Sequence, residues 1–141
     1  MPSSVVRIFT DPVEYFTGIR NLQIVGIIHQ RGAFCAKFTR IDLHRLGVSR
    51  ADENLPRIMK VPSRAVAGIL FATDPAQPAM RINGIEIADR QIFRNGLDWE
   101  WYIRSSAPCR WGSMSLEPAD LAAAGEAIIG PNWRRRLSPA A

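Results

Sequence analysis

The sequence predicts a mainly β (α+β) protein built as a small barrel or a two-sheet sandwich. Residues 32–46, which read GAFCAKFTRIDLHRL, are rich in strand formers and alternate apolar with polar side chains, as a strand with one buried face does. The apolar positions shift by one residue at Arg40, and such a shift predicts a β-bulge or a change of sheet. A bent strand of this kind is typical of small barrels and sandwiches.

Residues 80–87, MRINGIEI, predict a β-hairpin. Asn83 and Gly84 favour a type I′ turn, because both central positions of that turn need a positive φ. The two-residue turn fixes three cross-strand pairs: Ile82–Ile85, Met80–Ile87 and Arg81–Glu86. The apolar face and the charge pair agree on one register, which supports the prediction.

A short helix is predicted at residues 12–19. Asp11 can cap it, Pro12 suits its first position, and Glu14 can complete a capping box. Residues 22–28, LQIVGII, follow as an almost continuous apolar run. At that length the run predicts a strand that is buried on both faces.

The middle of the chain predicts further strands separated by loops. Residues 47–54 are polar and charged, which predicts a loop. Residues 97–104 show the most regular alternation in the chain, with apolar side chains at the odd positions. The other strands are predicted at residues 55–61, 65–71 and 110–116.

A second helix is predicted from Pro118 to a stop at Gly130. Its apolar residues fall on one narrow stripe, which could pack on the barrel or on a second copy of the chain. The stripe consists of Leu121, Ala124, Gly125, Ile128 and Ile129. We expect residues 1–131 to form one domain and residues 132–141 to be a tail or a linker remnant.

Length and composition are those of an ordinary single-domain protein. The chain has 141 residues, 47% of them hydrophobic, and no apolar run near the ~20 residues that cross a bilayer. Its first residues lack the basic and apolar segments of a signal peptide. The chain has only two cysteines, Cys35 and Cys109, so the fold does not require a disulfide framework, although a single disulfide between them is an alternative. We therefore expect reduced thiols, a cytoplasmic location and no membrane partner.

The net charge of +5 invites comparison with nucleic-acid-binding proteins. Arg134, Arg135 and Arg136 supply three of the 18 basic residues, so the rest of the chain has 15 basic against 13 acidic residues, a net of +2. A nucleic-acid interface needs basic residues clustered on one face, and these are scattered. We expect no direct DNA binding by this chain alone.

Residues that carry enzyme chemistry are sparse. His29 and His44 are the only histidines and each stands alone, so no metal site is expected. The sequence has no nucleophile, phosphate-binding or dinucleotide-binding motif. Cys35 falls within a predicted strand, and we expect it to be a small core residue.

Asp98 and Glu100 are a candidate pair of carboxylates on one face of a predicted strand. Tyr102 and Arg104 share that face, so a solvated polar surface explains the pattern better than an acid–base site. We expect no cofactor, no catalytic residue and no enzyme activity. A small enzyme that uses Asp98, Glu100 and Tyr102 without a metal is the alternative.

Four aromatic side chains are expected to point into the interior: Phe34, Phe38, Trp99 and Trp101. They could line a ligand pocket or fill the core, and the sequence leaves both open. Arg40 lies where the apolar pattern shifts, so we expect it at the mouth of such a pocket, binding a carboxylate on the ligand. The ligand-binding hypothesis is therefore a small, mostly apolar effector that can carry an acidic group.

The order of these patterns resembles the N-terminal sensing domain of AraC-type transcription regulators. The resemblance covers Phe9 to Pro131. After the capped helix and the apolar strand, the matching segments read G-x-F-x-A-x-F-x-R-I-D-L-x-R-L, NLPRIMKVPSRAVAGILFATDP, ING and WGSMSLEPADLAAAGEAIIG. The resemblance implies a cupin-like β-barrel or jelly roll with a short N-terminal helix and a C-terminal helix. The paired histidines of metal-binding cupins are missing, which argues against the enzymes of that fold.

In such regulators this domain binds a small-molecule effector or mediates dimerisation, and a separate pair of helix-turn-helix motifs binds DNA. The resemblance thus implies a non-enzymatic effector-binding or dimerisation domain that lacks the helix-turn-helix module. It also implies a homodimer through the final helix, with Leu121, Ala124, Ile128 and Ile129 at the interface. A stand-alone interaction partner of a full-length regulator is a further alternative.

Overall fold

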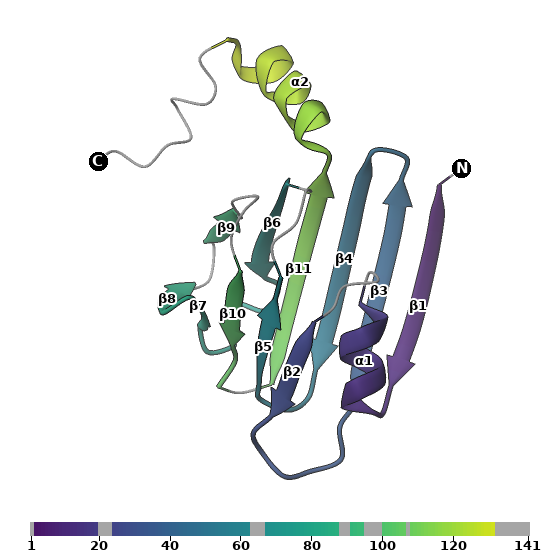
Figure 1. Cartoon of the computed structure of the whole chain (residues 1–141), viewed down its shortest axis with the longest axis vertical. Helices are drawn as coiled ribbons and strands as arrows, with labels where there is room; N and C mark the ends of the chain where they lie inside the picture. Colours follow the sequence, from purple (N-terminus) through teal and green to yellow (C-terminus); the bar gives the residue numbers. More distant parts are fainter. Residues whose placement is uncertain are drawn as a thin grey trace.

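The computed structural model describes residues 2–19, 24–62, 67–87, 91–94, 100–106 and 108–131. Within these ranges the chain forms a large and a small antiparallel sheet and two helices (Figure 1). In spatial order, the large sheet contains β1 (Ser3–Phe9), β3 (Ala36–Leu43), β4 (Leu46–Glu53), β11 (Cys109–Leu116), β6 (Ala67–Ala72) and β9 (Ile92–Arg94). The small sheet contains β2 (Val25–Ile28), β5 (Arg57–Val61), β10 (Trp101–Arg104), β7 (Met80–Ile82) and β8 (Ile85–Ile87). The helices are α1 (Pro12–Gly18) and α2 (Pro118–Ile129).

This architecture confirms the predicted fold class, a mainly β, cupin-like arrangement with a short N-terminal helix and a C-terminal helix. The two sheets enclose one apolar core, to which the buried aromatic residues Phe9, Phe38 and Trp111 belong. Neither described helix is long and apolar enough to cross a membrane.

The hairpin of β7 and β8 has the predicted register. Its cross-strand pairs are Met80–Ile87, Arg81–Glu86 and Ile82–Ile85. Asn83 and Gly84 have φ values of 49° and 82°, as the type I′ turn requires. The Asn83 side chain also ties the turn to β10, because its Oδ1 accepts a hydrogen bond of 2.8 Å from the Tyr102 backbone N–H.

Both helices begin and end where the local sequence predicts. Asp11 Oδ1 accepts hydrogen bonds from the backbone N–H groups of Val13 and Glu14, at 2.7 and 3.3 Å, so the predicted cap of α1 is confirmed. Pro118 opens α2, and Gly130 ends it with a φ of 96°. That left-handed conformation suits glycine, the residue without a Cβ.

The predicted bulge at Arg40 is wrong. Strand β3 pairs with β4 from Ala36–Glu53 to Leu43–Leu46 without an inserted residue. The alternation of faces therefore continues through the shift in the sequence pattern. Arg40 stays on the inner face, which meets the small sheet, and Ile41 turns to the outer face, where it is 38% exposed.

The predicted loop at residues 47–54 is also wrong, because most of it belongs to β4. This strand points Ser49, Ala51 and Glu53 inward, and all three are buried. Two of these side chains are small and the third is charged, so the strand lacks the apolar alternation by which buried strands are recognised.

Strand β2 is not buried on both faces, in contrast to the prediction. It forms an edge of the small sheet, and its Val25 and Ile27 side chains are each 64% exposed. Its other face meets α1 through Gly26, where a Cβ would lie 2.4 Å from the Phe16 ring. Gly26 therefore allows the close approach of helix and strand. Cys35, expected in the core, is exposed because it precedes β3 on the outward side.

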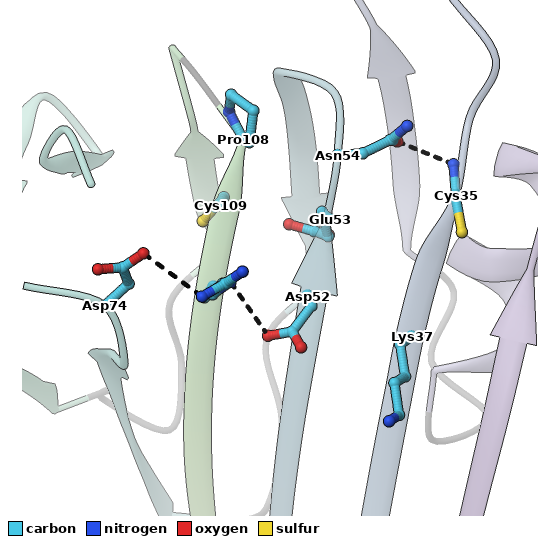
Figure 2. Close-up of a pocket in the computed structure, with 9 residues that line it drawn as sticks. Cys35, Lys37, Asp52, Glu53, Asn54, Asp74, Pro108 and Cys109 are labelled. Atoms are coloured by element: carbon cyan, nitrogen blue, oxygen red, sulfur yellow. Dashed lines mark hydrogen bonds and ion pairs between the residues drawn. The ribbon is translucent and has the colours of Figure 1, made fainter. Parts of the chain in front are cut away.

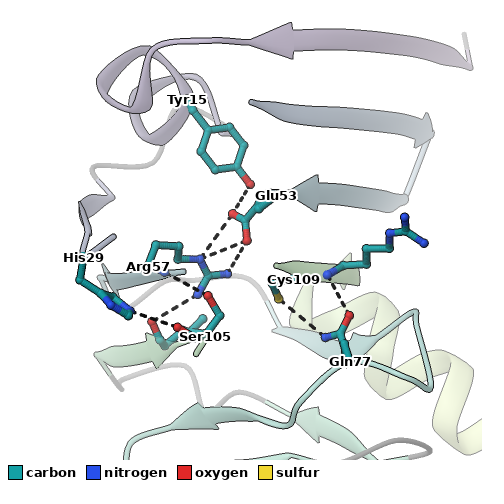
Figure 3. Close-up of polar contacts among 9 residues, drawn as sticks. Tyr15, His29, Glu53, Arg57, Gln77, Ser105 and Cys109 are labelled. Carbon is teal, nitrogen blue, oxygen red and sulfur yellow. Dashed lines mark hydrogen bonds and ion pairs between the residues drawn. The ribbon is translucent and has the colours of Figure 1, made fainter. Parts of the chain in front are cut away.

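An ion pair between Glu53 and Arg57 lies buried between the two sheets (Figure 3). Arg57 Nη2 lies 3.0 Å from Glu53 Oε1, and the two side chains are 1% and 0% exposed. The Tyr15 hydroxyl donates a hydrogen bond of 2.5 Å to Glu53 Oε2. Arg57 Nη1 donates one of 3.3 Å to the Ile103 carbonyl. These contacts join α1, β4, β5 and β10 at one end of the sandwich.

Two groups beside the ion pair have raised pKa values. Burial raises the pKa of the Tyr15 hydroxyl well above its usual value, and the Glu53 carboxylate raises it further. Burial also raises the pKa of the Cys109 thiol, to about 11. Both groups are therefore neutral in the folded protein at physiological pH.

These shifts predict that the protein loses stability in alkaline solution. The pKa values of both groups are higher in the folded than in the unfolded protein, so their neutral forms favour the folded state. For Cys109 this contribution to stability is complete below pH 9.0, the usual pKa of the thiol, and it is lost as the pH rises through about 11. The loss for Cys109 alone approaches ~2–3 kcal/mol. Chemical denaturation across this pH window measures it, and Cys109→Ala should lose less stability than the wild type. An identical pH dependence in both proteins would show that Cys109 is not responsible.

Candidate functional site

The inner face of the large sheet changes in character along its strands. Its strands are paired in register, so residues at one level lie side by side. The lower end, as drawn in Figure 1, carries the buried ion pair, and the next level carries Phe38 and Trp111. Above them, Arg40 and Asp42 make the upper level polar. The interior is thus charged at the closed end, aromatic in the middle and polar at the upper end.

The interior contains two buried tryptophans, Trp101 on the small sheet and Trp111 on the large one. The indole Nε1 atoms of Trp101 and Trp111 are buried and have no hydrogen-bond partner among the described residues. Trp111 packs against Phe38 with ring centroids 6.3 Å apart, and Trp101 packs against Phe93 at 5.0 Å. A buried donor without an acceptor is costly, so an acceptor on a bound molecule would satisfy it.

The polar upper level opens into a hollow of about 290 Å³, which we call the upper hollow. Arg40 and Asp42 form one wall, and Glu117 and Asp120, at the start of α2, form another. The Arg40 guanidinium binds Asp42 through two hydrogen bonds, Nη2 to Oδ1 at 2.7 Å and Nε to Oδ2 at 2.9 Å. This bidentate contact largely compensates the charge of Arg40.

The upper hollow adjoins the first turn of α2 through a second ion pair. Arg45, in the turn between β3 and β4, lies 3.2 Å from Asp120 through its Nη1 and the Asp120 Oδ1. Both residues also line the upper hollow. A molecule that enters the hollow therefore contacts the groups that hold the base of α2.

The predicted ligand-binding residues are only partly brought together. Phe34, Phe38 and Trp101 are buried as expected. Phe34, however, packs against Tyr15 near the closed end, with ring centroids 5.5 Å apart. Trp99 lies outside the described residues. Arg40 lies at the upper hollow, where its bond to Asp42 occupies the guanidinium group that was expected to bind a ligand carboxylate.

Two residues of this region escape the sequence analysis. Trp111 falls in a predicted strand but is not recognised as a partner of Phe38, because only the pairing through β4 brings the two rings to one level. Asp42 follows Arg40 at a spacing of two, which places both side chains on one face of a regular strand. A bulge at Arg40 would place the two side chains on opposite faces, so the prediction of a bulge separates them.

A second hollow, of about 370 Å³, lies beside the ends of β4 and β11 that carry Glu53 and Cys109 (Figure 2). Arg110 in its wall is already paired, since it lies 3.6 Å from Asp74 and 3.9 Å from Asp52. Its guanidinium group is therefore compensated by carboxylates of the same surface.

The residues considered for acid–base chemistry and metal binding do not converge. Glu100 forms an ion pair of 3.3 Å with Lys60, and Tyr102 is exposed on the same strand region. Asp98 lies outside the described residues. Among the residues with described placement, no three His, Cys, Asp or Glu side chains are grouped so that they could hold a metal ion.

The residues predicted for a dimer interface lie on α2. Leu121 and Ala124 are half-buried, and Ile128 is 82% exposed. The side chain of Ile129 is outside the described part of the chain. Figure 1 shows α2 continuing past the upper end of β11 rather than lying across either sheet.

No family model and no curated protein matches the chain. Solved structures that are similar to the chain include the following two. One is Rhodobacter sphaeroides SigE in complex with the anti-sigma ChrR, with a TM-score of 0.47 and 9% identity over 74% of this chain. The other is PA5104 from Pseudomonas aeruginosa PAO1, a conserved protein of unknown function, with a TM-score of 0.44 and 16% identity over 82% of this chain. This chain spans 55% of the first matched chain and 59% of the second.

The two unpaired indole donors predict binding of apolar molecules that carry a hydrogen-bond acceptor. Methyl benzoate, an aromatic ester whose carbonyl accepts hydrogen bonds, should move the indole N–H resonances of Trp101 and Trp111 downfield in ¹H–¹⁵N spectra. Ethylbenzene, which lacks the acceptor, is the matched control and should move them less. Trp111→Phe removes one donor and should weaken methyl benzoate binding by about tenfold. Resonances that stay in place at millimolar ester would contradict the assignment.

Proposed function

We propose that this chain is a non-enzymatic effector-binding and dimerisation domain of a transcription regulator of the AraC type. The order of sequence patterns from Phe9 to Pro131 supports the family. The cupin-like fold agrees with it, and the upper hollow offers a place for an effector beside α2. DNA binding then belongs to a separate helix-turn-helix module of the regulator.

One observation carries this proposal: the upper hollow and the base of α2 share their residues. Arg45 and Asp120 line the hollow and also form an ion pair between the β3–β4 turn and the first turn of α2. An effector changes an equilibrium only through contacts that differ between two states. If α2 has two orientations relative to the large sheet, a molecule in the upper hollow contacts Asp120 differently in each, and it therefore favours one orientation.

α2 is suited to pass such a change to a second subunit. It follows β11 directly, so a movement at Leu116 or Glu117 reorients the whole helix. Ile128 near its far end is exposed to solvent, so its side chain is available for contact with a second subunit. The proposed output of the domain is therefore the geometry of a homodimer.

The dimer is tested by Ile128→Glu in α2. The wild type should show a concentration-dependent dimer in light scattering, and the variant should weaken it at least about tenfold, because a carboxylate would be buried without a partner. Ala123→Glu adds the same charge on the exposed opposite side of the helix and is the matched control. It should leave the dimer intact. A wild type that stays monomeric at high micromolar concentration would contradict the dimerisation role.

A further inference from the structure

The outer face of the large sheet carries apolar side chains at its upper end. Strand pairing sets Ile41, Val48, Met114 and Ile69 in one row across four strands. The next row contains Leu43, Leu46 and Leu116. We call these seven residues the apolar band. Ile41, Leu43 and Met114 are 38%, 46% and 37% exposed, so the band is open to solvent in the single chain.

The band is the reverse side of the polar upper level. On the same strands Arg40, Asp42 and Ser49 point inward, and the band residues point outward. The usual arrangement of a sandwich, apolar inside and polar outside, is thus inverted at this end of the sheet. Contiguous apolar surface of this kind marks an interaction site.

Charge and size favour an acidic amphipathic helix as the occupant. Arg94 is exposed on the outer face beside the band, and so is Arg50, which lies 3.7 Å from Asp52. The charged residues of α2 are all acidic, Asp120 and Glu126, and Glu117 precedes them. A helix of 12 residues is about 18 Å long, and four neighbouring strands span about 14 Å.

The α2 helix of the same chain does not reach this surface. It continues past the end of β11 (Figure 1), and Arg45 holds its first turn at the end of the sheet through Asp120. The helix that can lie across the band therefore belongs to a second copy of the chain. A two-fold axis makes the contact reciprocal, since each copy then both supplies a helix and receives one.

We propose that the apolar band is the receptor surface for α2 of a second copy, so that the homodimer exchanges its C-terminal helices. The inference rests on the proposed function, which does not say where α2 binds on the second subunit, and it names that surface. It differs from a dimer in which two α2 helices pack only on each other, because such a dimer does not use Ile41 or Met114.

Ile41→Asp tests the band. The substitution places a carboxylate in the apolar band that would receive the acidic helix, and it should raise the dissociation constant of the dimer at least about tenfold. Ile27→Asp is the matched control, because Ile27 is an exposed isoleucine on β2 of the small sheet. Melting temperatures of both variants, measured at a concentration where each is monomeric, show that they are folded.

A mixture of Ile41→Asp and Ile128→Glu completes the test. In a dimer of either variant alone, both helix–band contacts are damaged. In the mixed dimer, the unchanged helix of the Ile41→Asp chain meets the unchanged band of the Ile128→Glu chain, so one contact is intact. The mixture should therefore dimerise more tightly than either variant and less tightly than the wild type. A dimer broken by Ile128→Glu but not by Ile41→Asp would overturn the helix exchange and leave the proposed dimerisation in place. Absence of recovery in the mixture would also overturn it, and a monomeric wild type would overturn both.

Discussion

The buried ion pair of Glu53 and Arg57 holds the two sheets and the first helix together. Its Coulombic attraction must offset the removal of two charges from water, which it does only when their hydrogen-bonding groups are satisfied. Here Tyr15 donates to the carboxylate and the Ile103 carbonyl accepts from the guanidinium. Because these four residues come from four different elements, satisfying the pair fixes the mutual position of α1, β4, β5 and β10. These contacts join the two sheets and α1 at the lower end of the sandwich.

A closed lower end leaves the upper end to carry function. There the large sheet reverses its usual polarity: Arg40 and Asp42 point inward and Ile41 points outward. The inward groups make a polar hollow beside α2, and the outward groups make an apolar surface. One stretch of β3 thus serves both halves of the proposed role, effector binding inside and association outside. Regular alternation along a single strand is enough to produce both.

Turns and helix caps, which depend on residues adjacent in the sequence, could be predicted from the sequence. The burial of β3 and β4 could not, because polar residues face inward and apolar residues face outward at the upper end of the large sheet. The turn at Asn83 and the cap at Asp11 depend on local backbone chemistry, and both were predicted. The predicted bulge at Arg40 is wrong because the apolar residue that follows it, Ile41, lies on the outer face rather than in the core. The predicted loop at β4 is wrong because Ser49 and Glu53 are buried by pairing and charge compensation rather than by hydrophobicity. The nearness of Phe38 and Trp111 depends on strand order, which no local pattern contains.

The most direct test of this account is a double-mutant cycle on the ion pair, with Glu53→Gln, Arg57→Met and the double variant compared in chemical denaturation. Each single substitution leaves a buried polar or charged group without its partner and should cost ~3–5 kcal/mol. The double variant should cost clearly less than the sum, because neither partner is then left alone. If instead the two effects add within ~0.5 kcal/mol, the pair does not couple the two sheets, and the account of the closed end is wrong.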